Sequence, residues 1–336
     1  IHLLEPKGQF GSRLLGGQDS ASERYIFTQL NSLTRLLFPV ADDPVLKYLQ
    51  EDGHSIEPDF YAPILPFVLV NGIMGIGTGF SCNIPSFSPR ELVRSLQVRL
   101  SGSINNEIPP DRCWTPYYEG FKGTVEPIHS TGQPGQPIEE TSATPTKFLI
   151  KGRYEKIGPD KIRITELPVG TWTSPYKTLL EELCDGNQVD KAGKRIPPLI
   201  KDVISHSTDT VVDMTVELFP GKLAEWEAHK GPNGINGLEK NLHLSTTVST
   251  TNMHLFDTQG KLRKFGNIDD ILEAYYPERL AIYGKRKQHV LTDLEAQHVL
   301  LSGRSRFIEE VLADHVDLRR KTGAQVEDLL QKRGYA

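Results

Sequence analysis

An arginine–tyrosine pair that follows a glycine-rich stretch is the first candidate for chemistry in this sequence. Residues 8–17 contain four glycines, and Arg24-Tyr25 comes a few residues later. Glycine tolerates positive φ and close backbone approach, which a loop lying against a large ligand needs. A phenol is a poor nucleophile at neutral pH, but an adjacent guanidinium favours the phenolate and stabilises charge on an attacked phosphate. The pair indicates a candidate phosphoryl-attacking tyrosine, although such pairs are more common as packing residues.

A second glycine motif, Gly75 to Gly79, follows the apolar run 67–70. A strand followed by Gly-x-Gly-x-Gly is typical of a dinucleotide-binding loop, so a nucleotide-binding module is one alternative. No convincing βαβ unit follows, and Pro85 would cut the expected helix short. A tight turn is therefore the simpler interpretation of the motif.

Composition narrows the class of protein. The chain has 336 residues, 38% hydrophobic content and a formal net charge of −5, which allows two or three ordinary domains but no overall basic character. Any nucleic-acid surface must therefore be local. The three cysteines are far apart without metal-ligand spacing, so we expect neither a zinc site nor a disulfide framework. We expect no membrane span, and a chain that opens on Ile1 reads as an internal piece of a longer protein.

Periodicity predicts the elements that would position these residues. Apolar spacing over 26–37 predicts an amphipathic helix with Tyr25 at its start, and a further helix is expected over 45–49. The run 67–70 predicts a buried strand. Ser88-Pro89 begins a helix with good capping chemistry.

The second half of the sequence alternates between strand and helix patterns. Strands are expected at 120–125, 148–150, 162–164 and 211–216, and a helix near 176–183. The polar stretch 129–146 is expected to be a surface loop. From Ile268 onward the spacing of apolar residues is helical and similar to a coiled-coil seam, with Pro277 expected to kink or start a helix.

These motifs together resemble the type IIA DNA topoisomerases, and specifically the eukaryotic topoisomerase II pattern. The resemblance rests on Gly8 to Arg13, on the Arg24-Tyr25 pair and on the Gly75 to Gly79 motif, in the family's order. Ile76 follows Tyr25 by 51 positions (76 minus 25), which is the family's spacing.

Three of the positions that depart from the family pattern bear on activity. Gln18 stands where lysine is usual, Glu23 where proline or alanine is common, and Gly170 where an arginine is expected. The first change removes a phosphate contact expected of the lysine, and the second adds a negative charge beside the tyrosine. A catalytically silent DNA-binding or scaffold piece is therefore a second alternative.

The resemblance implies roles for individual residues. Tyr25 would be the nucleophile that cleaves DNA, with Arg24 beside it as the second catalytic residue. An isoleucine in the position of Ile76 wedges between base pairs in this family and bends the DNA. The residues implied to contact DNA are Arg13, Gln18, Ile76 and Thr78.

The resemblance also implies the activity and the cofactors of the longer protein. It would be an ATP-dependent, nuclear, homodimeric topoisomerase that cleaves double-stranded DNA through a 5′-phosphotyrosyl intermediate, passes a duplex and religates the break. Mg²⁺ and ATP would both be bound upstream of Ile1, and neither is expected within this chain. The fragment alone is therefore expected to be inactive.

The implied fold class is a multidomain α+β chain. Residues 1–66 would be the C-terminal part of a winged-helix domain with the active-site tyrosine. Residues 67–264 would form a mixed α/β tower domain with an insertion loop at about 129–146. Residues 265–336 would begin a long coiled-coil arm.

Overall fold

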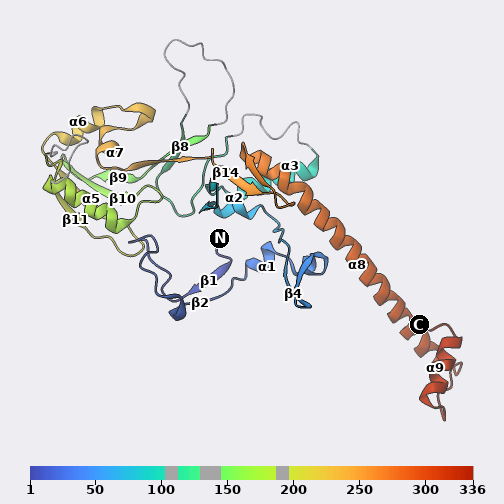
Figure 1. Cartoon of the computed structure of the whole chain (residues 1–336). Helices are drawn as coiled ribbons and strands as arrows, with labels where there is room; N and C mark the ends of the chain where they lie inside the picture. The colour runs from blue at the N-terminus through green and yellow to red at the C-terminus, as the bar shows by residue number, and fades with distance from the viewer. Residues whose placement is uncertain (103–112, 129–144, 187–196, 336) are drawn as a thin grey trace. The chain divides into compact units, whose positions relative to one another are not determined.

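The computed structural model describes residues 1–102, 113–128, 145–186 and 197–335. Most of the predicted insertion loop, residues 129–144, lies outside this described part. The chain divides into two compact units, shown together in Figure 1. The first comprises Ile1–Leu37 and Leu65–Tyr275, and the second comprises Phe38–Ile64 and Tyr276–Ala336.

A four-stranded antiparallel sheet holds the largest core of the first unit. Its strand order is β11-β12-β10-β9, with β9 at Arg153–Lys156, β10 at Lys161–Glu166, β11 at Ile200–Ser205 and β12 at Met214–Leu218. Alternate residues of β10 and β12 are buried, as a sheet with one covered face requires. The helices beside this sheet in Figure 1 are α5 (Thr173–Asp185), α6 (Lys222–Ala228) and α7 (Gly237–Asn241). All three supply side chains to the same apolar cluster as the sheet.

Smaller sheets and hairpins complete this unit. A three-stranded sheet has the order β13-β8-β7, from Ser245–Ser249, Lys147–Lys151 and Thr124–Pro127. Two hairpins are β5–β6 (Ile73–Ile76 and Ser81–Ile84) and β14–β15 (Met253–Phe256 and Leu262–Phe265). The remaining helices near them are α2 (Phe67–Asn71), α3 (Pro89–Ser101) and the short η3 (Pro232–Gly234).

The N-terminal segment forms a two-stranded ribbon. Strand β1 (Leu4–Lys7) pairs antiparallel with β2 (Phe27–Leu30), preceded by η1 (Glu23–Tyr25) and followed by α1 (Thr34–Leu37). The prediction of one amphipathic helix over 26–37 is therefore wrong. Every residue of β2 is exposed, so the apolar spacing in this segment does not correspond to a buried helix face within this chain.

Two further predictions are corrected. The run 67–70 forms the helix α2, because a short apolar run fits a buried helix as well as a strand. The helix expected over 45–49 is replaced by η2 (Val40–Val45) and the strand β3 (Tyr48–Glu51). Other predictions are confirmed in kind, including the helices from Pro89 and around 176–183 and the strands at 148–150 and 162–164. The strand expected at 211–216 begins later, at Met214.

The second unit contains the hairpin β3–β4, where β4 spans His54–Pro58, helix α8 from Tyr276 onward, and helix α9. Helix α8 runs from Ile268 to Leu312 and passes through Pro277 without ending there, and α9 spans Gly323–Lys332 (Figure 1). Within this unit, Arg279 Nη1 donates to Asp42 Oδ2 at 2.6 Å, and both side chains are buried. The coiled-coil arm stays a prediction, since α8 is seen here as a single helix.

Candidate active site

Tyr25 sits at the end of a long loop that the β1–β2 ribbon closes. The ladder pairs Lys7 with Phe27, so residues 8–26 leave and return at one place. Tyr25 is the last residue of η1 and is 66% exposed. The Arg24 guanidinium lies over its ring, with Cζ 5.0 Å from the ring centroid. The two predicted catalytic side chains are therefore adjacent, exposed and in cation–π contact.

The loop is braced from within. The Ser12 amide donates to Asp19 Oδ1 at 3.0 Å, and the Ser12 hydroxyl donates to Asp19 Oδ2 at 2.6 Å. These two hydrogen bonds lower the pKa of the Asp19 carboxyl, which stays ionised and keeps accepting them. Gly11 and Gly17 also approach closely, since a Cβ on Gly11 would lie 2.4 Å from Gly17 Cα. Because neither glycine has a side chain, two segments of the loop backbone can come into contact at this point.

The same loop is bound to the start of helix α5. The Ser174 amide donates to the Leu14 carbonyl at 2.9 Å, and the Thr173 amide donates to the Arg13 carbonyl at 3.4 Å. Amides in the first turn of a helix lack partners within the helix, so the loop carbonyls satisfy them. The Arg13 guanidinium is paired with the Glu166 carboxylate at the end of β10. The loop thus makes main-chain contacts with helix α5 and a charged contact with strand β10 of the four-stranded sheet.

Ile76 and Thr78 lie on a separate element, the tip of the β5–β6 hairpin. Ile76 pairs with Ser81, and the Gly77 amide donates to the Phe80 carbonyl at 2.8 Å. Ile76 is 93% exposed and Thr78 is exposed as well. An apolar side chain this exposed has no packing role in the described part of the chain.

The hairpin setting also decides the dinucleotide-loop alternative. Residues 75–79 form the end of one strand and the turn to its antiparallel neighbour, and the element before them is helix α2. A dinucleotide loop joins a strand to a helix whose N-terminus faces the phosphates. The structure lacks that arrangement around the described residues 67–84, so the nucleotide-binding alternative is not supported.

Sequence reasoning missed two residues that hold the loop, Glu166 and Trp172. The Trp172 indole lies against Gly16, where a Cβ would be 2.2 Å from the ring. Both residues lie within four positions of Gly170, where the sequence departs from the family pattern, but nothing in that pattern indicated a contact with the loop. The cleft beside this contact is lined by Arg13, Tyr118–Phe121 and Glu166–Trp172.

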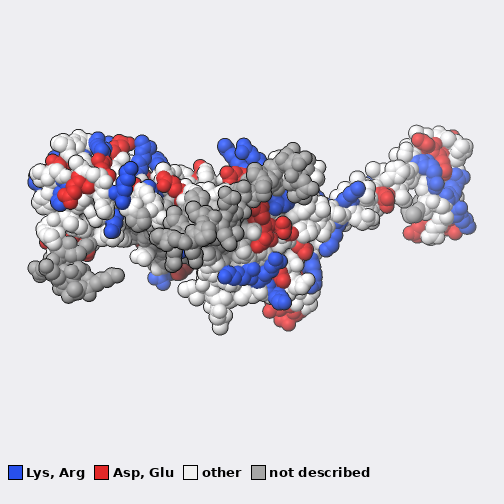
Figure 2. Space-filling model, turned by 90° about the horizontal axis from the view of Figure 1, so that it is seen from above, with Lys and Arg blue, Asp and Glu red and all other residues white. Residues whose placement is uncertain are grey.

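Charge on the surface is mixed. Figure 2 shows basic and acidic side chains interleaved over one face of the molecule. Several basic residues of the four-stranded sheet are already paired, such as Arg163 with Asp213 at 2.7 Å. Lys161 and Lys201 both pair with Glu217, which lowers the pKa of that carboxyl to about 2. These lysines and arginines therefore stabilise the sheet surface and do not form an open basic stripe.

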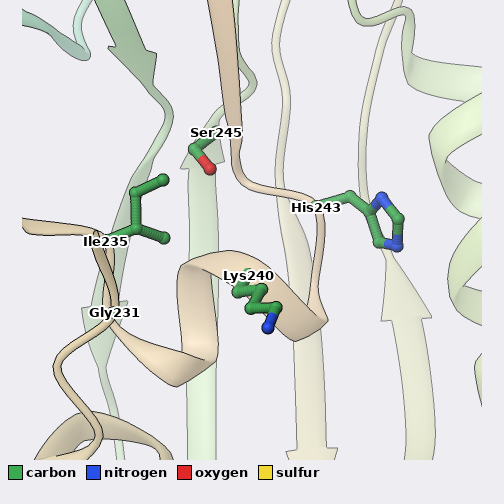
Figure 3. A pocket seen from close by; sticks show the side chains of 5 residues that line it. All are labelled: Gly231, Ile235, Lys240, His243 and Ser245. Atoms are coloured by element: carbon green, nitrogen blue, oxygen red, sulfur yellow. The ribbon is translucent and has the colours of Figure 1, made fainter. Parts of the chain in front are cut away.

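A second pocket in the first unit does not bring functional groups together. It is lined by Gly231, Ile235, Lys240, His243 and Ser245. Figure 3 shows the His243 imidazole directed away from the other four residues, and the Lys240 amine does not turn toward Ser245. No group of three or more His, Cys, Asp or Glu side chains with metal-binding geometry occurs among the described residues. No helix in the described part of the chain is long and apolar enough to cross a membrane.

A family model that describes the A subunit of DNA gyrase/topoisomerase IV matches residues 1–335. The chain belongs to this topoisomerase family. The match covers nearly the whole sequence and confirms the resemblance found from the glycine motifs and the Arg24-Tyr25 pair.

Individual topoisomerases show how much of the family protein the chain represents. It is 41% identical to "DNA topoisomerase 2" of Bombyx mori and 39% identical to "DNA topoisomerase 2-alpha" of Homo sapiens, each over 100% of this chain. The chain spans about a fifth of the length of these topoisomerases, 20% in both cases. Among solved structures it matches the Plasmodium falciparum topoisomerase II DNA-binding, cleavage and re-ligation domain, with a TM-score of 0.80 and 36% identity. That match covers 100% of this chain and 41% of the other. The mixed α+β fold class is thereby confirmed.

Proposed function

We propose that this chain is part of the DNA breakage-reunion core of an ATP-dependent type IIA topoisomerase, with Tyr25 as the nucleophile. The observation that carries the proposal is the exposed Tyr25 ring beneath the Arg24 guanidinium, at the end of a braced glycine-rich loop. It is supported by membership of a topoisomerase family and by the names of the relatives.

The proposed reaction is a reversible transesterification. The Tyr25 phenol oxygen attacks a DNA phosphorus, a new O–P bond forms to the 5′ phosphate, and the bond from phosphorus to the 3′ oxygen breaks. The leaving oxygen takes up a proton and becomes a 3′ hydroxyl, and the phenol proton is lost. Because the phosphotyrosyl ester keeps the energy of the phosphodiester, religation needs no ATP. The Arg24 guanidinium stabilises the charge that develops on the attacked phosphate.

The DNA-facing residues are proposed on two elements. Gln18 belongs to the Tyr25 loop and is exposed beside the braced turn. Ile76 and Thr78 are exposed on the β5–β6 tip, where an apolar wedge can enter a base step and offset part of the unstacking cost. The prediction that Arg13 contacts DNA stays untested, and its guanidinium is bound to Glu166 in this structure.

The domain assignment is likewise a proposal. Residues 1–66 would be the C-terminal part of a winged-helix domain, 67–264 the tower domain, and 265–336 the first part of a coiled-coil arm. The four-stranded sheet with α5, α6 and α7 supports a compact domain inside the second range. The 45-residue helix α8 supports an arm in the third.

The remaining proposals concern the longer protein. It would act on double-stranded DNA as a nuclear homodimer, with Mg²⁺ and ATP bound outside this chain. The described residues do not assemble a group of acidic, histidine or cysteine side chains that would hold a metal ion. When bound, Mg²⁺ would supply charge neutralisation at the phosphate, while this chain would supply the nucleophile, Arg24 and the DNA-bending tip.

The test is the covalent adduct formed by the complete protein on a labelled duplex. Wild-type protein should become linked to the strand carrying the 5′ phosphate, and peptide mapping should place the link on Tyr25. Tyr25→Phe should bind DNA and form no adduct, whereas Tyr61→Phe, which removes the hydroxyl of another exposed tyrosine, should behave as wild type. Wild-type protein that binds DNA without any adduct would favour the silent-scaffold alternative suggested by Gln18, Glu23 and Gly170. Adducts that persist in Tyr25→Phe would reject Tyr25.

A further inference from the structure

A buried carboxylate, Glu166, is the charged anchor of the loop that carries Tyr25. It is 2% exposed and ends strand β10, 153 residues from its partner Arg13. Its Oε1 accepts from the Arg13 Nη2 and from the Leu167 amide at 3.0 Å. Its Oε2 accepts from the Lys122 amide at 3.3 Å. Both oxygens are thus engaged, and the sheet domain fixes the carboxylate from two directions.

The loop is also held by main-chain contacts at Arg13 and in the residues that follow it. The carbonyls of Arg13 and Leu14 accept from the first-turn amides of α5, and Gly16 lies directly against Trp172. The bonds between Ser12 and Asp19 then connect the anchored part of the loop to the part that leads to Tyr25. A displacement of Arg13 would therefore also displace Tyr25, because the hydrogen bonds within the loop keep its two parts from moving independently.

The charges argue against a DNA phosphate as the principal partner of Arg13. The Arg13 side chain is 31% exposed, and its guanidinium is shared with a carboxylate that is almost fully buried. A phosphate that drew the guanidinium away would leave Glu166 ionised and without its cation inside the protein, which is costly. The same pairing also neutralises Arg13, so little net attraction for phosphate remains.

We infer that Glu166, acting through Arg13, is a positioning residue for Tyr25, and that this ion pair sets the placement of the nucleophile and not the affinity for DNA. The inference rests on the proposed function, because it assumes that Tyr25 attacks DNA. Small errors in the placement of a reacting group cost much in rate, so the pair should affect adduct formation far more than binding.

The experiment compares variants of the complete protein on one fluorescent duplex with Mg²⁺. Arg13→Gln and Glu166→Gln should each slow single-turnover formation of the Tyr25 adduct by at least about tenfold. The Kd for DNA, measured by anisotropy without cleavage, should stay within about twofold, with an unchanged dependence on salt. The double variant should be no slower than either single one, because both remove the same contact. Arg13→Lys, which keeps the positive charge, should recover much of the rate.

Two further variants separate positioning from general damage. Arg163→Gln removes an arginine from an ion pair of the same domain, with Asp213, and should leave adduct formation at the wild-type rate. Gly16→Ala changes no charge but forces a Cβ toward Trp172, and it should slow adduct formation with little change in Kd. Melting curves identify any variant that fails to fold, and Arg13→Lys and Gly16→Ala then carry the test.

The outcomes distinguish this inference from the proposed function. If wild-type protein forms the Tyr25 adduct and the Arg13 and Glu166 variants match its rate, the positioning role is rejected while the proposed function stands. If Arg13→Gln weakens DNA binding and lowers the salt slope by about one, while Glu166→Gln does not, Arg13 is a phosphate contact and the inference is wrong. If wild-type protein forms no adduct at all, the proposed function itself fails.

Discussion

The rings of Phe80 and Phe256 meet edge to face, with centroids 5.7 Å apart and an interplanar angle of 86°. Phe80 closes the turn that follows Ile76, and Phe256 ends the neighbouring strand β14. The Asn252 side-chain amide adds a hydrogen bond to the Ser81 hydroxyl at 2.8 Å. The tip that carries Ile76 therefore packs against a second hairpin, β14–β15, while the Ile76 side chain itself stays exposed to solvent.

This support leads to a prediction for Ile76. Ile76→Ala should leave the free energy of unfolding within about 0.5 kcal/mol of wild type, because the side chain is 93% exposed. The loss should appear as a smaller DNA bend, measured by fluorescence energy transfer between the ends of a bound duplex. Ile84→Ala is the matched control in the same hairpin. Ile84 is 2% exposed, and its truncation should cost about 2–5 kcal/mol. A large stability loss in Ile76→Ala with an unchanged bend would contradict the wedge.

Arg24 should matter more for the chemical step than for binding. Arg24→Ala removes the guanidinium beside the Tyr25 ring, and single-turnover cleavage by the complete protein should slow by about 100-fold or more. The Kd for DNA should change much less. Arg153→Ala serves as a control, because it removes an exposed arginine that is paired with Glu155 of the same strand, β9. Equal losses of cleavage and affinity would mean that Arg24 is a simple phosphate anchor.

A buried hydroxyl offers a stability test for the sheet domain. Tyr176 is 2% exposed, and its hydroxyl donates to the Leu242 carbonyl at 2.7 Å, while burial raises the pKa of the phenol. Tyr176→Phe leaves that carbonyl without its donor and should cost about 1 kcal/mol. Urea denaturation should show a lower midpoint with an unchanged slope. Tyr117→Phe, which loses only an exposed bond to Glu119, should stay within about 0.5 kcal/mol.

Acid should weaken the same domain through Glu217. Hydrogen bonds from Lys201 and Lys161 lower the pKa of this carboxyl from 4.5 to about 2 in the folded protein. Its contribution to stability is therefore complete above the unfolded value of 4.5 and is lost as the pH falls toward 2. Melting temperatures of wild type and Glu217→Gln should differ at pH 6 and converge as the pH approaches 2. A difference that grows below pH 4 would contradict the assignment.

The sequence was sufficient where local pattern and tertiary environment agree. Residues 148–150 and 162–164 lie in strands whose apolar side chains are buried, and Ser88-Pro89 precedes a helix as capping chemistry predicts. The same sequence placed Tyr25 beside Arg24 and Ile76 in a glycine-flanked turn. In these cases the residues that decide the structure are neighbours in the chain.

Prediction from the sequence failed where contacts between residues far apart in the chain determine the local structure. Apolar spacing over 26–37 fits a helix, but pairing with Leu4–Lys7 makes residues 27–30 a strand. The run 67–70 is too short for periodicity to separate strand from helix. The ion pair of Arg13 with Glu166 joins residues 153 positions apart, and no local sequence pattern predicts it. Loop anchoring is a property of the folded domain and was therefore invisible in the sequence.

The chemistry of the hairpin tip has a consequence for which DNA sites would be cut. Ile76 has an aliphatic side chain without hydrogen-bond donors or acceptors, and its neighbours Gly75 and Gly77 have no side chains at all. The side chains at positions 75–77 therefore offer no hydrogen bond that could distinguish bases by their groove edges. As a wedge, it would select for base steps that unstack at low cost, and pyrimidine–purine steps do so most readily. Site preference would then follow the deformability of the duplex at the kink and not a recognition sequence.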